Sequence, residues 1–345
     1  PTLTGPAYGF LRASLGPGQP LLMVMGTSFY DHQIADGFFA DNGVDEMGFP
    51  EFDPFDPTPL NSEFKLLEPT GFDGVEWDNA ATLPTQRPMG GAVSDLDNDG
   101  DQDLMVSTTA HFSALVFENL GEWPMGDRTL QVDAQLPRND MLMEAIPWGI
   151  APLDLDQDGR VDFVVAHGDD ATSFEGGGRN PQPTTVWWNG GDWRFEEITA
   201  LTGLGRLESW RSVCVGDLEL DGDADLIVGG SYSVLPRVYR NDIETENHGF
   251  SLALRGRTSN RPGIGATVMV ESDAVNTGRG FLMGDTSSPH CTQEPVIFVG
   301  LGKAEVADRV TVTWPSGYVQ VVEDLEAGTQ HTISEPPLIK LFPKE

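Results

Sequence analysis

Three short acidic loops hold the residues in this chain that are best suited to chemistry. Each loop has carboxylates at positions 1, 3, 5 and 9 and a glycine at position 6. The residues at positions 1, 3, 5, 7 and 9 are Asp95, Asp97, Asp99, Asp101 and Asp103 in the first loop, Asp154, Asp156, Asp158, Arg160 and Asp162 in the second, and Asp217, Glu219, Asp221, Asp223 and Asp225 in the third. This spacing gathers oxygen atoms around one point, and a hard cation with many oxygen ligands, Ca²⁺ above all, is the natural occupant. We therefore expect about three Ca²⁺ sites, with position 7 contributing its backbone carbonyl rather than its side chain.

The segment after each loop distinguishes these loops from helical calcium sites. An EF-hand needs a glutamate at position 12 and flanking helices, whereas position 12 is valine here: Val106, Val165 and Val228. The apolar runs that contain these valines are short and bounded by turn residues, which is typical of buried strands.

The spacing of the loops predicts the architecture. Position 1 of successive loops is separated by 59 residues (95 to 154) and then by 63 residues (154 to 217). A period near 60 leaves room for about four strands, the content of one β-propeller blade. A fainter copy without an acidic loop runs from Tyr8 to Met25. We therefore predict an all-β chain with a propeller of about four visible blades in residues 1–246, and we leave open whether that propeller is complete.

The C-terminal part follows a different pattern. Residues 247–335 contain short alternating strands and predict a small antiparallel β-sandwich, with a tight hairpin at residues 315–317. The expected strands cover residues 250–254, 267–270, 296–300, 309–314, 319–322 and 329–333. Residues 336–345 contain prolines and are expected to form an extended tail.

Both parts resemble known families. The acidic loops and the Asn-containing turns at Asn119, Asn189 and Asn241 resemble FG-GAP (VCBS) repeats. The segments 248–256, 259–266, 299–302 and 310–317 resemble the ASPIC/UnbV domain, and the combination resembles the cartilage acidic protein family and its bacterial relatives. The resemblance implies a secreted, Ca²⁺-binding, non-catalytic protein. The chain departs from the pattern at Glu219 and in the segment 284–295, whose role cannot be read by analogy.

Composition limits the kinds of binding partner and the cellular location that we expect. The chain has 54 acidic and 20 basic residues, a net charge of −34, which argues against nucleic acid or an anionic membrane as partner. No apolar run approaches the ~20 residues of a membrane-spanning helix, so direct membrane insertion is not expected. Calcium-loaded loops fit an extracellular, periplasmic or cell-surface location. Because the chain begins at Pro1 without a signal peptide, we expect it to be processed or part of a longer product.

The two cysteines leave two possibilities open. Cys214 lies before the third acidic loop and Cys291 lies in the atypical segment 284–295. They form a disulfide between the two parts of the chain, or they remain one buried thiol and one loop thiol.

Two inserts interrupt the propeller pattern, at residues 31–60 and 169–184. Each insert is either a solvated loop or a site of contact with a partner. The Phe-rich segment 31–60 is the better candidate for such a contact.

The sequence gives little support for catalysis. It contains no nucleophile elbow, phosphate-binding loop or zinc-protease motif, and its six histidines lack metal-ligand spacing. His167, near Asp169 and Asp170, is expected to be a polar rim residue rather than a group that faces the propeller axis. The leading hypothesis is a Ca²⁺-binding, non-catalytic interaction or scaffold protein with a protein or polysaccharide partner. The alternatives are an accessory subunit of a larger extracellular or membrane-attached assembly, joined through residues 31–60, and an enzyme with a site at the propeller axis.

Overall fold

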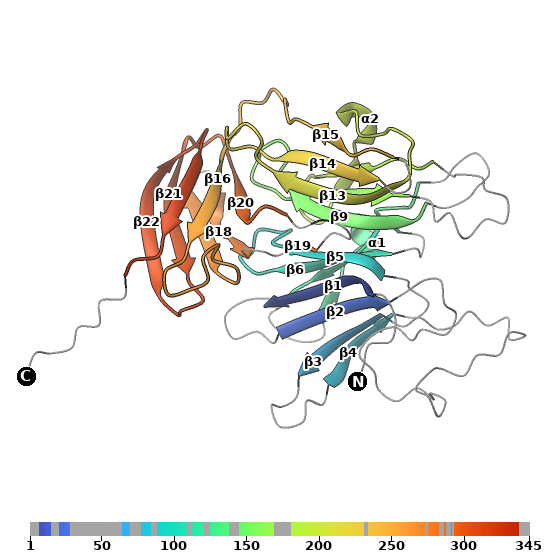
Figure 1. Ribbon diagram of the computed structural model, residues 1–345, viewed down its shortest axis with the longest axis horizontal. Coiled ribbons are helices and arrows are strands. Elements are labelled where there is room, and N and C mark those ends of the chain that lie inside the picture. Colours follow the sequence, from blue (N-terminus) through green and yellow to red (C-terminus); the bar gives the residue numbers. More distant parts are fainter. Residues whose placement is uncertain are drawn as a thin grey trace, which may run out of the picture.

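The computed structural model confirms the all-β prediction (Figure 1). Within the part of the chain it describes, helix is limited to the four-residue segments α1 (Thr129–Val132) and α2 (Thr199–Thr202). Neither has the length or hydropathy that a membrane-spanning helix needs. The described residues are 7–14, 21–27, 64–69, 77–83, 88–108, 112–120, 125–137, 145–168, 181–230, 234–272, 275–282, 286–287, 291 and 293–337. The 31–60 insert, residues 169–180 of the second insert, and most of the tail lie outside them.

Four consecutive antiparallel sheets form the predicted blades. The first contains β1 (Ala7–Ser14), β2 (Leu21–Thr27), β3 (Phe64–Pro69) and β4 (Trp77–Leu83). The second contains β5 (Pro88–Ser94), β6 (Asp103–Thr108), β7 (Ala114–Glu118) and β8 (Gly126–Asp127). The third contains β9 (Pro147–Leu153), β10 (Asp162–His167), β11 (Thr185–Asn189) and β12 (Phe195–Glu197). The fourth contains β13 (Trp210–Gly216), β14 (Asp225–Gly230) and β15 (Arg237–Tyr239).

The blades pack face to face through their apolar strands. Successive side chains of a strand point to opposite faces, so Val165 of β10 enters the core shared with the second blade while Val164 enters the core shared with the fourth. Both side chains are fully buried, and each such burial contributes about 1.5–3 kcal/mol. The continuous apolar run of β10 therefore reflects a strand that lies between two neighbouring blades. Among the described residues, no backbone pairing closes the fourth blade onto the first.

In the described part of the C-terminal sandwich, seven strands form two sheets. One sheet has the order β20-β16-β23 and the other β18-β17-β21-β22. Their bounds are β16 (His248–Arg255), β17 (Thr267–Ser272), β18 (Val275–Leu282), β20 (Val296–Gly302), β21 (Val306–Thr313), β22 (Val319–Glu326) and β23 (Gln330–Ser334). The two sheets enclose one apolar core, in which Phe250 and Trp314 are the largest fully buried side chains.

One strand pair of the sandwich departs from the antiparallel prediction, because β23 runs parallel to β16. The strand before β23 lies in the opposite sheet, so the chain crosses between sheets and can enter alongside β16 in the same direction. The expected hairpin at residues 315–317 is present: the Gly317 N–H donates to the Trp314 carbonyl, and Gly317 has a left-handed φ of 81°.

The atypical segment 284–295 connects the sandwich to the propeller region. Its strand β19 (Thr286–Ser287) pairs with β5, so it adds a strand to the second blade. Four residues beyond β19, Cys291 forms a disulfide with Cys214 of β13, at a Cα–Cα distance of 5.9 Å. The disulfide alternative is therefore the correct one. The insert crosses from the sandwich to the second blade and is anchored covalently to the fourth.

A buried carboxylate closes the end of the sandwich. Glu335 accepts hydrogen bonds at Oε2 from the backbone N–H groups of Arg257, Thr258 and Ser259, and at Oε1 from the Ser316 hydroxyl. Burial opposes ionisation, but the hydrogen bonds from Ser316 and from the three N–H groups outweigh it and lower the pKa of Glu335 to about 2. The ionised form of this side chain therefore stabilises the fold.

We predict that Glu335→Gln lowers the melting temperature at pH 7, because hydrogen bonds to a charged acceptor contribute about 1.5–3 kcal/mol. The folded pKa lies below the unfolded value of 4.5, so this stabilisation is present above pH 4.5 and is lost as the pH falls toward 2. Thermal unfolding between pH 2 and 7 should show the gap between wild type and variant closing in that range. The exposed Glu323→Gln is the matched control, and a gap that does not depend on pH would contradict the prediction.

Candidate metal centre

The three acidic loops share one backbone conformation. Position 6 has a left-handed φ in each loop, 99° at Gly100, 94° at Gly159 and 96° at Gly222. Position 4 is also left-handed, although it is not glycine: the residues there are Asn98, Gln157 and Leu220, with φ values of 63°, 57° and 63°. A leucine in this region is strained, so the loop fold itself imposes the conformation.

The carboxylate at position 1 organises the inside of each loop. In the first loop, the N–H groups of Asp99 and Gly100 donate to the two oxygens of Asp95, each at 3.1 Å. Gly159 donates to Asp154 at 2.9 Å and Gly222 to Asp217 at 3.1 Å in the other loops. The chain therefore wraps around the position-1 side chain.

The aspartate at position 9 attaches each loop to its own blade. Asp162 is buried and accepts the N–H of Leu155 at 2.9 Å and the N–H of Asn189 at 2.7 Å. Asp103 and Asp225 make the corresponding pairs with the N–H groups of position 2 and of the asparagine that follows the next strand. The aspartate at position 9 therefore has two roles: it fixes the loop to its blade, and it places a carboxylate near the centre of the loop.

Two of the three loops bring carboxylates close enough to hold a metal ion. One oxygen each from Asp95, Asp97 and Asp99 lies within 4.8 Å of the others in the first loop. Asp154, Asp156 and Asp162 meet the same condition in the second loop. Such a set of hard oxygen donors fits a hard divalent cation.

The third loop differs from the other two at position 3, where Glu219 stands in place of an aspartate. The described residues show no comparable group of three carboxylates there. The Glu219 carboxylate instead forms an ion pair with Arg240, with an O–N distance of 3.2 Å. The longer glutamate reaches outward from the loop, where an aspartate would be held nearer the backbone.

Burial, with nearby negative charge, raises the pKa of several loop carboxylates. Burial, followed by repulsion from Asp99, raises the pKa of Asp97 to about 6. Burial is also the main cause that raises the pKa of Asp103 to about 9, against the opposing effect of its hydrogen bonds. The pKa of Asp162 is raised well above its usual value by burial and by the nearby Asp154. These carboxylates favour a bound proton, or an equivalent positive charge, in the folded chain.

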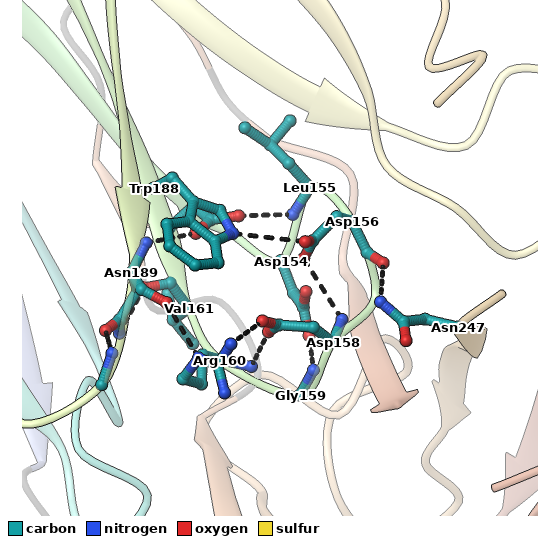
Figure 2. A network of polar contacts seen from close by, with 12 residues as sticks. Asp154, Leu155, Asp156, Asp158, Gly159, Arg160, Val161, Trp188, Asn189 and Asn247 are labelled. Atoms are coloured by element: carbon teal, nitrogen blue, oxygen red, sulfur yellow. Dashed lines mark hydrogen bonds and ion pairs between the residues drawn. The ribbon is translucent and has the colours of Figure 1, made fainter. Parts of the chain in front are cut away.

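The second loop contains a positively charged side chain, Arg160, at position 7 (Figure 2). The Arg160 guanidinium pairs with the Asp158 carboxylate, donates from Nε to the Asn189 carbonyl at 2.8 Å, and lies 5.7 Å from the centre of the Trp188 ring. Trp188 in turn donates to Asp156 Oδ2 at 3.2 Å. Position 7 was expected to act through its carbonyl alone, but here its side chain also holds the position-5 carboxylate.

Position 7 carries an aspartate in the other two loops, and its side chain is not turned away from the carboxylates. The Oδ1 atoms of Asp101 and Asp223 are buried, and neither has a hydrogen-bond partner among the described residues. Burial and repulsion from Asp99 raise the pKa of Asp101 to about 7, and burial and Asp221 raise that of Asp223. Sequence spacing did not reveal that these oxygens face the other acids.

Two of the turn asparagines, Asn189 and Asn241, join their blade to the acidic loop of the preceding blade. Asn189 donates from Nδ2 to the Leu96 carbonyl of the first loop and to the Val161 carbonyl, both at 3.0 Å. Asn241 makes the equivalent contact with the Leu155 carbonyl of the second loop at 2.9 Å. The sequence showed these asparagines as a repeated element but gave no sign that they link different blades.

The structure corrects the interpretation of His167. This residue is fully buried, so the prediction of a polar residue at the rim is wrong. Its Nδ1 lies 3.0 Å from the Pro183 carbonyl and its Nε2 lies 3.0 Å from the Ser113 hydroxyl. Burial lowers the pKa of His167 to about 4, so the ring is neutral at pH 7 and links two blades. Asp169 and Asp170, with His32, His111 and His290, lie outside the described residues.

Two protein-family models match parts of the chain. Residues 256–339 match the family described as ASPIC and UnbV, and residues 154–228 match the FG-GAP-like repeat. The predicted order, FG-GAP repeats followed by an ASPIC/UnbV domain, is therefore confirmed. The comparison with curated proteins gives no match. Among solved structures, the Dos1 propeller is similar over 94% of this chain and 84% of its own, at 10% identity and a TM-score of 0.32.

We predict that Asn189→Ala destabilises the protein by about 2–4 kcal/mol, because it leaves two backbone carbonyls without their donor, at about 1–3 kcal/mol each. Denaturant unfolding followed by tryptophan fluorescence measures the loss. Asn241→Ala, which removes one such contact at a more exposed site, is the graded control and should cost less. Wild-type stability of Asn189→Ala would refute the inter-blade role.

Proposed function

We propose that this chain is a calcium-binding, non-catalytic interaction or scaffold protein, in which Ca²⁺ held by the acidic loops stabilises the propeller blades. The residues that would hold the ions are those of the three loops. Asp95, Asp97 and Asp99 form one ligand group, and Asp154, Asp156 and Asp162 form the other. The third loop would bind more weakly, because Glu219 is paired with Arg240.

One observation carries this proposal: the same loop, with the same backbone conformation, recurs in three successive blades and gathers carboxylates that repel each other. Like charges this close destabilise the folded chain unless a cation offsets them. A bound Ca²⁺ would supply that positive charge, and its binding energy would add to the free energy of folding because the loop geometry does not exist in the unfolded chain.

The domain types support an interaction role. Propeller and FG-GAP domains generally serve as interaction modules, and the blade formed by β13–β15 has exposed apolar side chains, including Leu235 at 79% and Val238 at 61% exposure. Exposed apolar surface of this kind is a common feature of protein-binding sites. We therefore favour a protein partner over a polysaccharide.

The disulfide supports a location outside the reducing cytoplasm. Bonds such as Cys214–Cys291 persist in extracellular, periplasmic and cell-surface environments, where Ca²⁺ is also abundant enough for sites of modest affinity.

The two alternatives have weaker support. No observation on the described residues favours an enzyme with a site at the propeller axis. An accessory subunit joined through residues 31–60 depends on a segment outside the described residues. Neither alternative explains why the acidic loops are repeated.

We predict that chelation lowers the melting temperature by several degrees or more. Without the ions the carboxylates repel each other, and the folded state loses the stabilisation that it gains from binding Ca²⁺. Calorimetric or fluorescence melts in chelator, in Ca²⁺ and in Mg²⁺ test this. Ca²⁺ should restore the melt, whereas Mg²⁺ should do so poorly, since it requires a stricter geometry. An identical melt with and without chelator would overturn the proposal.

We predict that Asp99→Ala weakens Ca²⁺ binding by roughly tenfold or more, whereas Asp101→Ala has a smaller effect. Asp99 belongs to the ligand group of the first loop, while removing Asp101 also removes a source of repulsion. Asp158→Ala should weaken binding less than Asp99→Ala, because Asp158 is paired with Arg160 and lies outside the ligand group of the second loop. Calorimetric titration of each variant with Ca²⁺ measures the difference, and equal losses at positions 5 and 7 would contradict the assigned geometry.

A further inference from the structure

The first acidic loop is in direct backbone contact with the C-terminal sandwich. The N–H of Gly280, on β18, donates to Asp95 Oδ2 at 2.8 Å, and the Gly280 carbonyl accepts from Gln102 Nε2 at 2.8 Å. A side chain at Gly280 would overlap the carbonyl of Gly100, so only glycine allows this approach. Both polar groups of one sandwich residue are therefore committed to the loop.

The second loop also contacts the sandwich, here through its backbone carbonyls. The Gly302 N–H donates to the Gln157 carbonyl at 2.8 Å, and Asn247, directly before β16, donates from Nδ2 to the Asp156 carbonyl at 2.9 Å (Figure 2). Gly300 of β20 leaves no room for a side chain against the Asp154 carboxylate.

The third loop completes the pattern. The Ser251 hydroxyl on β16 donates to Asp217 Oδ2 at 2.9 Å. A Cβ at Gly222 would lie 3.1 Å from backbone atoms of Phe250 and Thr329, so the sandwich backbone rests on the loop glycine. In the first and third loops the sandwich donates a hydrogen bond to the position-1 carboxylate, the side chain around which the loop folds, and in the second loop Gly300 packs closely against that carboxylate.

We propose that the sandwich docks on the acidic loops and that docking and cation binding are thermodynamically linked. The inference rests on the proposed Ca²⁺ binding and names its consequence. A cation in the loops strengthens the contact between the propeller region and the sandwich, and the docked sandwich in turn raises the affinity of the loops for the cation. The residues outside the loops that carry the linkage are Asn247, Ser251, Gly280, Gly300 and Gly302.

The chemistry of these contacts explains why a linkage is expected. The donors that reach the loops are backbone N–H groups, a hydroxyl and an amide, all of them uncharged. They hold the carboxylates of Asp95 and Asp217 and the backbone of the second loop without cancelling the negative charge of the loops. Bringing uncharged donors, rather than cationic side chains, against uncompensated carboxylates has a desolvation cost that a divalent cation would reduce. By reciprocity, whatever a cation contributes to docking, docking contributes to cation affinity.

Figure 1 shows β16, β18 and β20 beside the blades that carry the loops. The Cys214–Cys291 disulfide keeps the sandwich tethered even when these contacts open. The linkage must therefore be measured as local opening rather than as dissociation.

Hydrogen exchange of the intact, disulfide-bonded chain with Ca²⁺ and with chelator provides the first test. We expect peptides covering 275–282 and 296–302, which contain the Gly280 and Gly302 amides, to lose protection in chelator. Peptides from the β21–β22 hairpin, which belongs to the sandwich but does not pair with the loops, should keep their protection. That contrast separates undocking from global unfolding.

Variants that leave every loop carboxylate in place provide the second test. Gly300→Ala inserts a methyl group against Asp154, and Asn247→Ala removes the donor to the Asp156 carbonyl. Both should weaken Ca²⁺ binding, within the roughly 5- to 150-fold range typical of coupled sites. Asn260→Ala, which alters only a turn within the sandwich, is the matched control and should bind Ca²⁺ as wild type does. If Gly300→Ala fails to fold, Asn247→Ala decides the question.

The outcomes separate this inference from the proposed function. Ca²⁺ binding with unchanged protection at 275–282 and 296–302, or with wild-type affinity in Asn247→Ala, overturns the linkage alone. Absence of Ca²⁺ binding to the wild-type chain overturns both.

Discussion

Mutual repulsion among carboxylates in three tight turns is the constraint on which the rest of the structure depends. Each turn holds several acidic side chains close together, and burial, with repulsion from neighbouring carboxylates as a smaller cause, raises the pKa of Asp97 and Asp103. The chain meets this constraint in two ways. Backbone N–H groups converge on the carboxylates at positions 1 and 9, and the geometry leaves oxygens that a divalent cation can bind. Hydrogen bonds fix the shape of the turn, whereas a cation would supply the missing charge.

The same turns connect parts of the molecule that are distant in sequence. Position 9 attaches the turn to its own blade, and an asparagine such as Asn189 attaches it to the next blade. Position 1 is shared with the C-terminal sandwich through Gly280 and Ser251. A change in the turns therefore affects blade packing and domain docking together, which explains why a small loop is repeated with so little variation in conformation.

Much of this could be predicted from the sequence because the responsible signals are local. The acidic spacing, the position-6 glycines and the apolar runs after each loop specify the turn and the buried strand that follows it. The parallel pairing of β23 with β16, the burial of His167 and the blade-to-blade contacts of Asn189 could not be predicted. Each of these depends on which segments meet in three dimensions, and a single sequence does not encode that in any local pattern. Glu219 was recognised as a departure, but its pairing with Arg240 required the arrangement of two separate turns.

The most direct test of the account is a crystal structure of the chain grown in millimolar Ca²⁺, with anomalous scattering used to locate the ions. The account predicts anomalous density among Asp95, Asp97 and Asp99 and among Asp154, Asp156 and Asp162, with a weaker peak in the third turn. Turns that remain free of metal at this concentration, with their conformation unchanged, would show that hydrogen bonds alone hold the carboxylates and would contradict the central claim.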